Sequence, residues 1–320
     1  MRTLWLISAL LSTAESCIRR PPDPSYEEHI LLLGGYTFPR QYVKESLEFD
    51  MDRHDFAILV GADMAYARLF FSAGVYERSA LVVHGFGSAG RARSAERMAR
   101  GTFGPAATPL GPPLGYSAGA TVGKEFVVCG GVDINEAALK MCQRYSFETD
   151  EWRSAANASR PFYGAASASD GENLYLIGGF DKHFLPLKDV RKYNAATDEW
   201  TDLKSLPEFI NDFTVLQPAA IYLRVPKPSL LACGQSKKRP GQQLCFVYDV
   251  ATNEWASEPQ LISRLPGTFD YELVKCRGRL WALLGDHKMS VVAYREKGKW
   301  IRLQKVFLPD FRAGFRAVCV

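Results

Sequence analysis

Short runs of apolar residues recur along the whole chain, and each run ends at glycine. Polar, turn-forming segments separate the runs, which predicts strands that are covered on both faces. The glycines that end the six runs stand 52, 44, 48, 55 and 51 residues apart: Gly35, Gly87, Gly131, Gly179, Gly234 and Gly285. In three of the runs a second glycine comes directly before the last: Gly34, Gly130 and Gly178. A period near 50 residues indicates one structural unit repeated six times.

Aromatic residues follow these glycines at two fixed distances. Four units carry one ring 14 residues after the final glycine and a second ring seven residues later: Phe49 and Phe56, Tyr145 and Trp152, Tyr193 and Trp200, and Tyr248 and Trp255. The sixth unit keeps Tyr294 and Trp300 after a shorter loop, whereas the second unit has no ring at either distance and is degenerate. Because aromatic residues make up only 12% of the chain, four double matches are not expected by chance.

Each unit predicts four antiparallel strands. A small, fairly apolar strand such as residues 116–122 leads through a tight turn into the apolar second strand. The third strand carries the Tyr, and a turn such as Thr149-Asp150-Glu151 leads into a fourth strand that begins with Trp. Repeated units of four antiparallel strands are typical of β-propeller blades. The sequence therefore predicts an all-β, six-bladed propeller whose second blade is degenerate.

The paired glycines, the later Tyr and the Trp seven residues after it resemble the Kelch repeat, as found in the propellers of animal Kelch-like adaptor proteins. The resemblance covers residues 29–320. The first unit starts directly at its second strand, and residues 311–320 have the pattern of a first strand. We therefore expect the C-terminal strand to complete blade one, which would leave no open sheet edge in the ring.

The N-terminal residues resemble a targeting segment. Arg2 precedes an apolar run from Leu4 to Leu11, and small residues follow, which is typical of a secretory signal peptide over residues 1–16. Residues 17–28 would then lead into the propeller. This predicts a secreted or secretory-pathway protein without a membrane span, because no run reaches the roughly 18 apolar residues that a spanning helix needs. The alternative is the end of a helix from an upstream domain, in a cytoplasmic protein.

Cysteines and one sequon depend on this choice of compartment. Cys129 with Cys142, and Cys233 with Cys245, occupy similar places in two repeats. We expect them to be small buried apolar residues or, in a secreted chain, two cross-strand disulfides. The single sequon, Asn157-Ala158-Ser159, falls in a predicted surface loop and would be used only in a secretory protein.

Composition and motifs exclude several function classes. A net charge of +4 without a concentrated basic face argues against nucleic-acid binding. No phosphate-binding loop, GxSxG or HExxH motif is present, and the five His and seven Cys lack metal-ligand spacing, so we expect no catalytic residue, metal or cofactor. Galactose oxidase and bacterial sialic acid mutarotases are also Kelch propellers. This sequence has no identifiable counterpart of the Tyr, His and Cys set of galactose oxidase. It also has none of the Glu/Arg pair of the mutarotases.

Two groups of residues are candidates for binding. Residues 91–100 have the charge pattern of a solvated insertion; the alternative is a short helix, displaced from blade two, that binds an acidic ligand through Arg91, Arg93 and Arg97. The resemblance to Kelch adaptors implies a second group, near the starts of the first strands, that lines one mouth of the channel and grips an acidic peptide. Its members are Arg160, Tyr163, Tyr116, Tyr271, Arg312 and Arg316. The alternative for them is ordinary packing at blade edges.

The sequence thus predicts a monomeric, non-enzymatic scaffold that binds a protein partner through loops at the propeller mouth. The alternative is a secreted carbohydrate-binding or carbohydrate-active propeller similar to sialic acid mutarotase. The signal-like N-terminus and the sequon favour that alternative.

Overall fold

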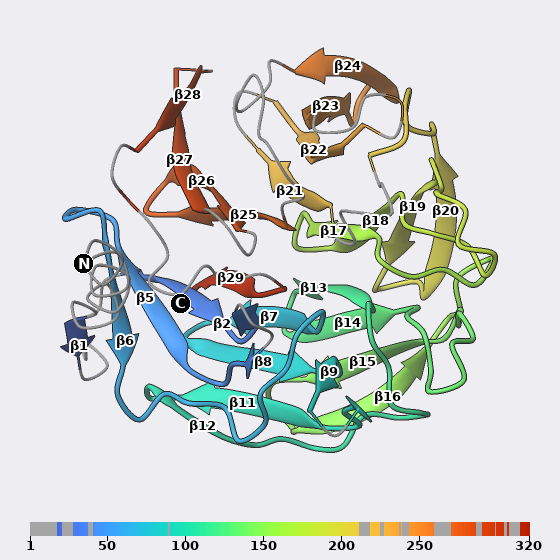
Figure 1. Cartoon of the computed structure of the whole chain (residues 1–320). Helices are drawn as coiled ribbons and strands as arrows, with labels where there is room; N and C mark the ends of the chain where they lie inside the picture. Colours follow the sequence, from blue (N-terminus) through green and yellow to red (C-terminus); the bar gives the residue numbers. More distant parts are fainter. Residues whose placement is uncertain are drawn as a thin grey trace, which may run out of the picture.

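The computed structural model describes residues 18–20, 28–37, 41–88, 90–210, 218–224, 227–236, 238, 243–258, 270–285, 290–297, 299–303, 306 and 314–320. Its regular elements are strands, and six sheets surround a common centre (Figure 1). Over the described ranges, no helix has the length and apolar character needed to cross a membrane. The expected signal peptide, residues 1–16, lies outside the described residues, as does Arg312.

Five of the sheets have four antiparallel strands in chain order. Blade two contains β7 (Ser72–Tyr76), β8 (Ser79–Val83), β11 (Ala95–Ala99) and β12 (Thr102–Pro105), and blade three contains β13 (Ala118–Val122), β14 (Glu125–Cys129), β15 (Cys142–Ser146) and β16 (Glu151–Ala155). Blade four contains β17 (Ala166–Ser169), β18 (Asn173–Ile177), β19 (Val190–Asn194) and β20 (Glu199–Leu203). Blade five contains β21 (Ala219–Leu223), β22 (Ser229–Gln235), β23 (Gln243–Asp249) and β24 (Glu254–Glu258), and blade six contains β25 (Asp270–Cys276), β26 (Arg279–Gly285), β27 (Ser290–Glu296) and β28 (Lys299–Arg302). The predicted all-β, six-bladed fold is confirmed.

Blade one joins the two ends of the chain. Its innermost strand is β29 (Arg316–Cys319), which pairs antiparallel with β2 (Ile30–Leu33). The sheet continues outward through β5 (Ser46–Asp50) and β6 (Asp55–Leu59). A further strand, β1 (Ile18–Arg20), adds to β6 in parallel, so the segment before the repeats contributes a fifth strand that the sequence pattern does not predict.

Two short hairpins extend the loops between second and third strands. In blade one, β3 (Tyr36–Thr37) pairs with β4 (Gln41–Tyr42), and in blade two, β9 (Phe86–Gly87) pairs with β10 (Gly90–Arg91).

The first strands of neighbouring blades contact one another around the axis, as Figure 1 shows for β29, β7, β13, β17, β21 and β25. They carry small residues because the blades converge there. A Cβ on Gly74 would lie 2.2 Å from the Phe126 ring, and one on Gly119 would lie 2.5 Å from the Val127 carbonyl oxygen. Farther out, the apolar second strands pack between blades and form most of the core.

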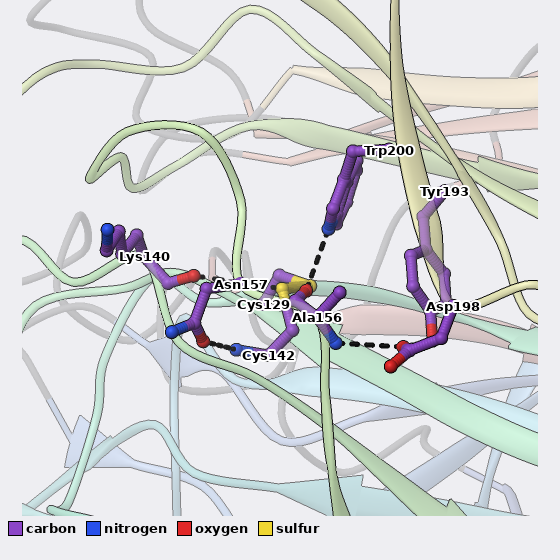
Figure 2. Close-up of a disulfide and its surroundings, with 8 residues drawn as sticks. All are labelled: Cys129, Lys140, Cys142, Ala156, Asn157, Tyr193, Asp198 and Trp200. Atoms are coloured by element: carbon purple, nitrogen blue, oxygen red, sulfur yellow. Dashed lines mark hydrogen bonds between the residues drawn. A yellow bond between two sulfur atoms is a disulfide. The ribbon is translucent and has the colours of Figure 1, made fainter.

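Three successive interfaces share a hydrogen-bonded Tyr, Asp or Asn, and Trp set, here called the interblade clip. In blade four the Tyr193 hydroxyl donates to Asp198 Oδ1 (2.6 Å), which also accepts the Ala156 N–H (2.8 Å). Trp200 Nε1 donates to the Ala156 carbonyl oxygen (2.8 Å; Figure 2). The bonds from Tyr193 and Ala156 hold the pKa of Asp198 below its ordinary value. The same set recurs as Tyr145, Asp150 and Trp152 in blade three, and as Tyr248, Asn253 and Trp255 in blade five.

Blade six holds its neighbours differently. The residue that pairs with Trp300 is Arg295, which forms an ion pair with Glu258 at the end of blade five. Tyr294 lies one position earlier and packs on Trp281 in the core cluster toward blade one. The prediction that Tyr294 is the equivalent of the other repeat tyrosines is therefore wrong, because the strand register places a salt bridge where the other blades have a Tyr.

In blade two the residues that correspond to the paired glycines are His84 and Gly85, and not the Gly87 that ends the apolar run in the sequence. Backbone angles of φ 64° at His84 and 99° at Gly85 match the 58° and 101° of Gly34 and Gly35, whereas Gly87 lies in β9. The aromatic pair is replaced by Met98 and Phe103, which face each other across β11 and β12. The unit is thus complete as a blade, and its degeneracy is one of side-chain identity.

The alternative of a helix over residues 91–100 is wrong. This segment contains β11, which pairs with β8 as the third strand of blade two. Strand structure is favoured because Ala95 and Met98 fill apolar space between blades while Glu96 meets a buried partner.

That partner is Arg68. Both side chains are buried, and the Arg68 guanidinium contacts Glu96 and also donates to the His84 carbonyl oxygen (2.9 Å) and to Ser94. The Glu96 carboxylate accepts the backbone N–H groups of Ala65 and Tyr66. A buried charge pair of this kind is tolerated only when its hydrogen-bonding capacity is largely used.

His84 should make the fold sensitive to acid. Its side chain is fully buried beside Gln143, and burial, followed by the charge of Arg68, lowers its pKa to about 3. The unfolded imidazole takes up a proton near pH 6.5, but the folded one does not until about pH 3. This contribution to stability is therefore fully present above pH 6.5 and is lost as the pH falls toward 3. The loss reaches about 3 kcal/mol at pH 4.

Urea unfolding of wild type and His84→Asn at pH 7 and pH 4 measures this effect. Asn also tolerates the left-handed backbone but does not titrate, so the variant should lose about 3 kcal/mol less than wild type over this interval. Equal losses in both proteins would contradict the assignment, and His84→Gly, with the residue that three other blades use there, provides a second comparison.

Candidate functional site

The backbone builds one mouth of the propeller in the same way in three consecutive blades. After each second strand, the chain forms an isolated bridge with the residue three positions before the first strand of the same blade. Leu69 and Phe86 exchange two backbone hydrogen bonds of 2.9 Å. The same exchange joins Gly115 with Val132, and Tyr163 with Phe180. Blades two, three and four therefore present equivalent rigid positions at this mouth.

The next residue in each case has a left-handed backbone. The φ angles are 51° at Phe70, 56° at Tyr116 and 62° at Gly164, and Gly314, which stands in the same position before β29, has φ of 66°. Each N–H donates to the preceding residue of this series, from Phe70 to Gly314 (3.2 Å), from Tyr116 to Phe70 (3.0 Å) and from Gly164 to Tyr116 (2.8 Å). Gly accepts this conformation readily, whereas large side chains rarely adopt it. Two aromatic side chains are thus held in place at a backbone cost, a feature that clusters at functional sites.

These rings are part of a continuous set, here called the aromatic arc: Phe70, Phe86, Tyr116, Tyr163, Phe180 and Phe184. Phe70 stacks on Tyr116 with centroids 4.5 Å apart, and Tyr163 stacks on Phe180 at 5.4 Å. The Arg91 guanidinium lies 4.8 Å from the Phe86 ring centroid. Phe86 and Tyr116 are half-buried and Phe184 is 50% exposed, so the arc is partly open to solvent.

Two loops of the same shape flank the arc. Residues 133–137 in blade three and 181–185 in blade four are each braced by an aspartate whose Oδ1 accepts two backbone N–H groups at 2.8–2.9 Å. The equivalent residues Glu136 and Phe184 both have φ of 61°. These rigid loops hold apolar side chains out in solvent, with Ile134 68%, Phe184 50% and Leu185 54% exposed.

Acidic groups border the arc. Burial, followed by the charges of Asp181 and Glu136, raises the pKa of Tyr163 to about 12, so its hydroxyl remains a neutral donor. Although burial opposes the shift, hydrogen bonds from Leu185 and His183 hold the pKa of Asp181 below its ordinary value, and its carboxylate stays charged. The surroundings of Tyr163 are thus more acidic than a basic, peptide-gripping mouth would be.

The predicted binding residues are only partly brought together. Tyr116 and Tyr163 belong to the arc, and Arg91 stacks on it. Arg160 forms an ion pair with Asp189, Arg93 donates to the Pro109 carbonyl oxygen (3.3 Å), and Arg97 donates to Ser79 Oγ and to the Phe147 carbonyl oxygen. Tyr271 lies in β25 with its side chain outside the described atoms, and Arg312 lies outside the described residues.

Arg316 occupies a different place, the central channel. Small residues of the first strands line a cavity of about 400 Å³ there. In its wall Arg316 Nη1 lies 2.6 Å from Glu272 Oε1, and Arg316 Nε donates to the Phe71 carbonyl oxygen (2.7 Å). Burial raises the pKa of Glu272 above its ordinary value, although Arg316 opposes the shift. The pair joins blade six to blade one and also places a perturbed carboxyl beside a cavity.

Cysteines pair throughout the described part of the chain. Cys129–Cys142 and Cys233–Cys245 are disulfides, the interpretation offered for a secreted chain, with Cα separations of 4.1 and 4.2 Å. A third, unpredicted disulfide joins Cys276 of β25 to Cys319 of β29, at 5.5 Å. Among the described residues one group has ligand atoms close enough for a metal, Glu28 with Cys276 and Cys319. Its two sulfur atoms are bonded to each other and so are not thiolate ligands.

Four residues of the arc are absent from the sequence-based candidates: Phe70, Phe86, Phe180 and Phe184. Alignment of the first strands would have found one of them, because Phe70, Tyr116, Gly164 and Gly314 each stand two residues before such a strand. Phe86, Phe180 and Phe184 follow second strands. They lie near the residues that precede the first strands only because isolated bridges join these distant segments.

Comparison with known proteins agrees with this architecture. Residues 161–207, which contain all four strands of blade four, match the family described as Kelch motif. No curated protein matches the chain. The chain is therefore a six-bladed β-propeller whose fourth blade carries a Kelch motif.

Proposed function

We propose that this propeller is a non-enzymatic interaction module that binds a protein partner through the aromatic arc and the loop 181–185. Kelch propellers commonly serve as protein-interaction modules. The observation that carries the proposal is the partly exposed arc, three of whose rings are held by left-handed backbone. Rigid aromatic anchors with adjacent exposed apolar groups are typical of interface hot spots.

The chemistry of the mouth favours an apolar segment of the partner over an acidic one. All five candidate arginines that the structure describes already contact groups of their own chain, and Asp181 and Glu136 lie near Tyr163. An acidic peptide would therefore meet carboxylates at the arc. Apolar side chains would instead bury Phe184 and Leu185, which are exposed in the free protein.

Replacement of the exposed anchors should strongly weaken partner binding without unfolding the propeller. We expect Phe184→Ala/Leu185→Ser to weaken the complex about 30-fold or more, as loss of a hot spot does. Proteins retained by the immobilised wild-type chain are identified by mass spectrometry, and the affinity of each purified candidate is then measured by calorimetry. Ile301→Ser is the matched control, because Ile301 is also an exposed apolar residue but lies in β28 of blade six.

A partner that binds wild type and Ile301→Ser but not the double variant supports the proposal. A set of partners that all bind the double variant with unchanged affinity contradicts it.

A carbohydrate ligand is the second candidate, and Glu272 with Arg316 is the specific observation in its favour. A carboxyl of raised pKa beside a cationic group and a cavity suits acid–base work on a small polar molecule. Binding or mutarotation of sialic acid that is lost in Glu272→Gln, but kept in Phe184→Ala/Leu185→Ser, would replace the interaction function with this one.

A further inference from the structure

The sequon Asn157-Ala158-Ser159 is the only one in the sequence, and the structure places it on the surface. It lies directly after β16 in blade three. Asn157 and Ser159 are exposed, whereas Ala158 is buried and anchors the loop in the core. The Ala158 N–H donates to the Lys140 carbonyl oxygen (2.9 Å). The two side chains that define an N-glycosylation acceptor are thus accessible on a fixed loop.

The Asn157 amide is also oriented. Its Oδ1 accepts the backbone N–H of Cys142 (3.4 Å). Figure 2 shows Nδ2 on the side of the amide away from the Cys129–Cys142 disulfide. An N-linked glycan is attached to Nδ2 and leaves Oδ1 available as an acceptor. The structure can therefore keep its bond to Cys142 while it carries a glycan at this position.

The disulfides indicate the compartment. Six cysteines fall in the described part of the chain, and all six form disulfides. Disulfides form and persist in oxidising compartments and are rare in the cytosol. The third disulfide joins residues 43 positions apart at the closure of the ring, so it contributes to the tertiary structure and is not confined to one hairpin.

We propose that the chain folds in the secretory pathway and carries an N-linked glycan on Asn157. The co-substrate is an oligosaccharide joined to a polyisoprenyl diphosphate. Asn157 Nδ2 attacks the anomeric carbon of the first sugar, and an N–C bond forms as the C–O bond to the diphosphate breaks. Nδ2 gives up one proton, and the lipid diphosphate leaves with the bonding electrons, so no oxidant or reductant is needed.

Expression of the full chain in eukaryotic cells tests this proposal. We expect a single glycoform whose extra mass is removed by peptide N-glycosidase, with conversion of Asn157 to Asp in the tryptic peptide. Asn157→Asp and Ser159→Ala should each lose the extra mass, and Ser159→Thr should keep it. Asn157→Asp and Ser159→Ala both lose the glycan but keep an oxygen acceptor at position 157 for the Cys142 N–H. A change in their thermal unfolding therefore reports the loss of the glycan and not the loss of this hydrogen bond.

Two results would overturn the proposal. One is a chain with all three disulfides formed and Asn157 unmodified. The other is a chain that stays in the cytosol with alkylatable thiols at the six described cysteines. Neither result bears on the aromatic arc, so the glycan and the interaction function can fail separately.

Discussion

A chain that ends at Asp310 is expected to lose its cooperative unfolding transition and to aggregate. The deletion removes β29, the innermost strand of blade one, and leaves β2 without its partner. It also removes the Glu272–Arg316 ion pair and the backbone bond from Phe70 to Gly314. Blades six and two would then face an incomplete blade, and β2 would present an unpaired apolar edge. Circular dichroism melting and size-exclusion chromatography of the truncated chain measure the outcome.

The control for this deletion keeps the strand and removes only the covalent bond. Cys276→Ala/Cys319→Ala should remain folded and monodisperse, with a free energy of unfolding lower by about 4 kcal/mol for a loop of 43 residues. A truncated chain that melts like this control would show that the closing strand is dispensable.

Arg68→Met should cost the fold about 3–5 kcal/mol, the usual consequence of removing one member of a buried ion pair. The substitution leaves the Glu96 carboxylate without its charged partner at a buried site and removes the donors to the His84 and Ser94 oxygens. Chemical denaturation at pH 7 measures the change. Because Glu96 also holds the backbone of residues 65 and 66, the loop before β7 should become more susceptible to proteolysis.

The double variant Arg68→Met/Glu96→Gln identifies the cause. Gln keeps an acceptor for the two backbone N–H groups but carries no charge, so the double variant should be more stable than Arg68→Met alone. The loss in the double variant is compared with the losses in Arg68→Met and in Glu96→Gln. If it equals their sum, the two charges do not stabilise each other.

The fold could be predicted from the sequence where the same residue types hold successive blade interfaces. The Tyr and Trp spacing is regular in blades three to five because of the interblade clip. Each Tyr bonds to the Asp or Asn of its own blade, and that residue and the Trp bond to the preceding blade. Blades two and six do not follow this spacing. In blade two, Met98 and Phe103 hold the equivalent interface by apolar contact, and in blade six, Arg295 holds it through an ion pair with Glu258. Spacing rules detect identical residues and miss chemically different replacements.

The site was harder to predict because its contacts join distant segments. Tyr116 and Tyr163 were recognised from their place before a first strand, but the neighbouring rings come from the ends of second strands. The arginines were overestimated as free binding groups, since their partners Asp189 and Glu272 lie 29 and 44 residues away in sequence. Disulfides follow the same division: the sequence offered the two hairpin pairs as one of two interpretations of these cysteines, and it did not indicate the pair across the ring closure.

Blade one is assembled from both ends of the chain, and this has a consequence for biosynthesis. β2 leaves the ribosome before blades two to six, whereas its inner partner β29 follows all of them in the chain. Until β29 has been made, β2 therefore has one unpaired, apolar edge that could associate with another nascent chain. The ring can close, and Cys276 can find Cys319, only after the strands of blades two to six have been made.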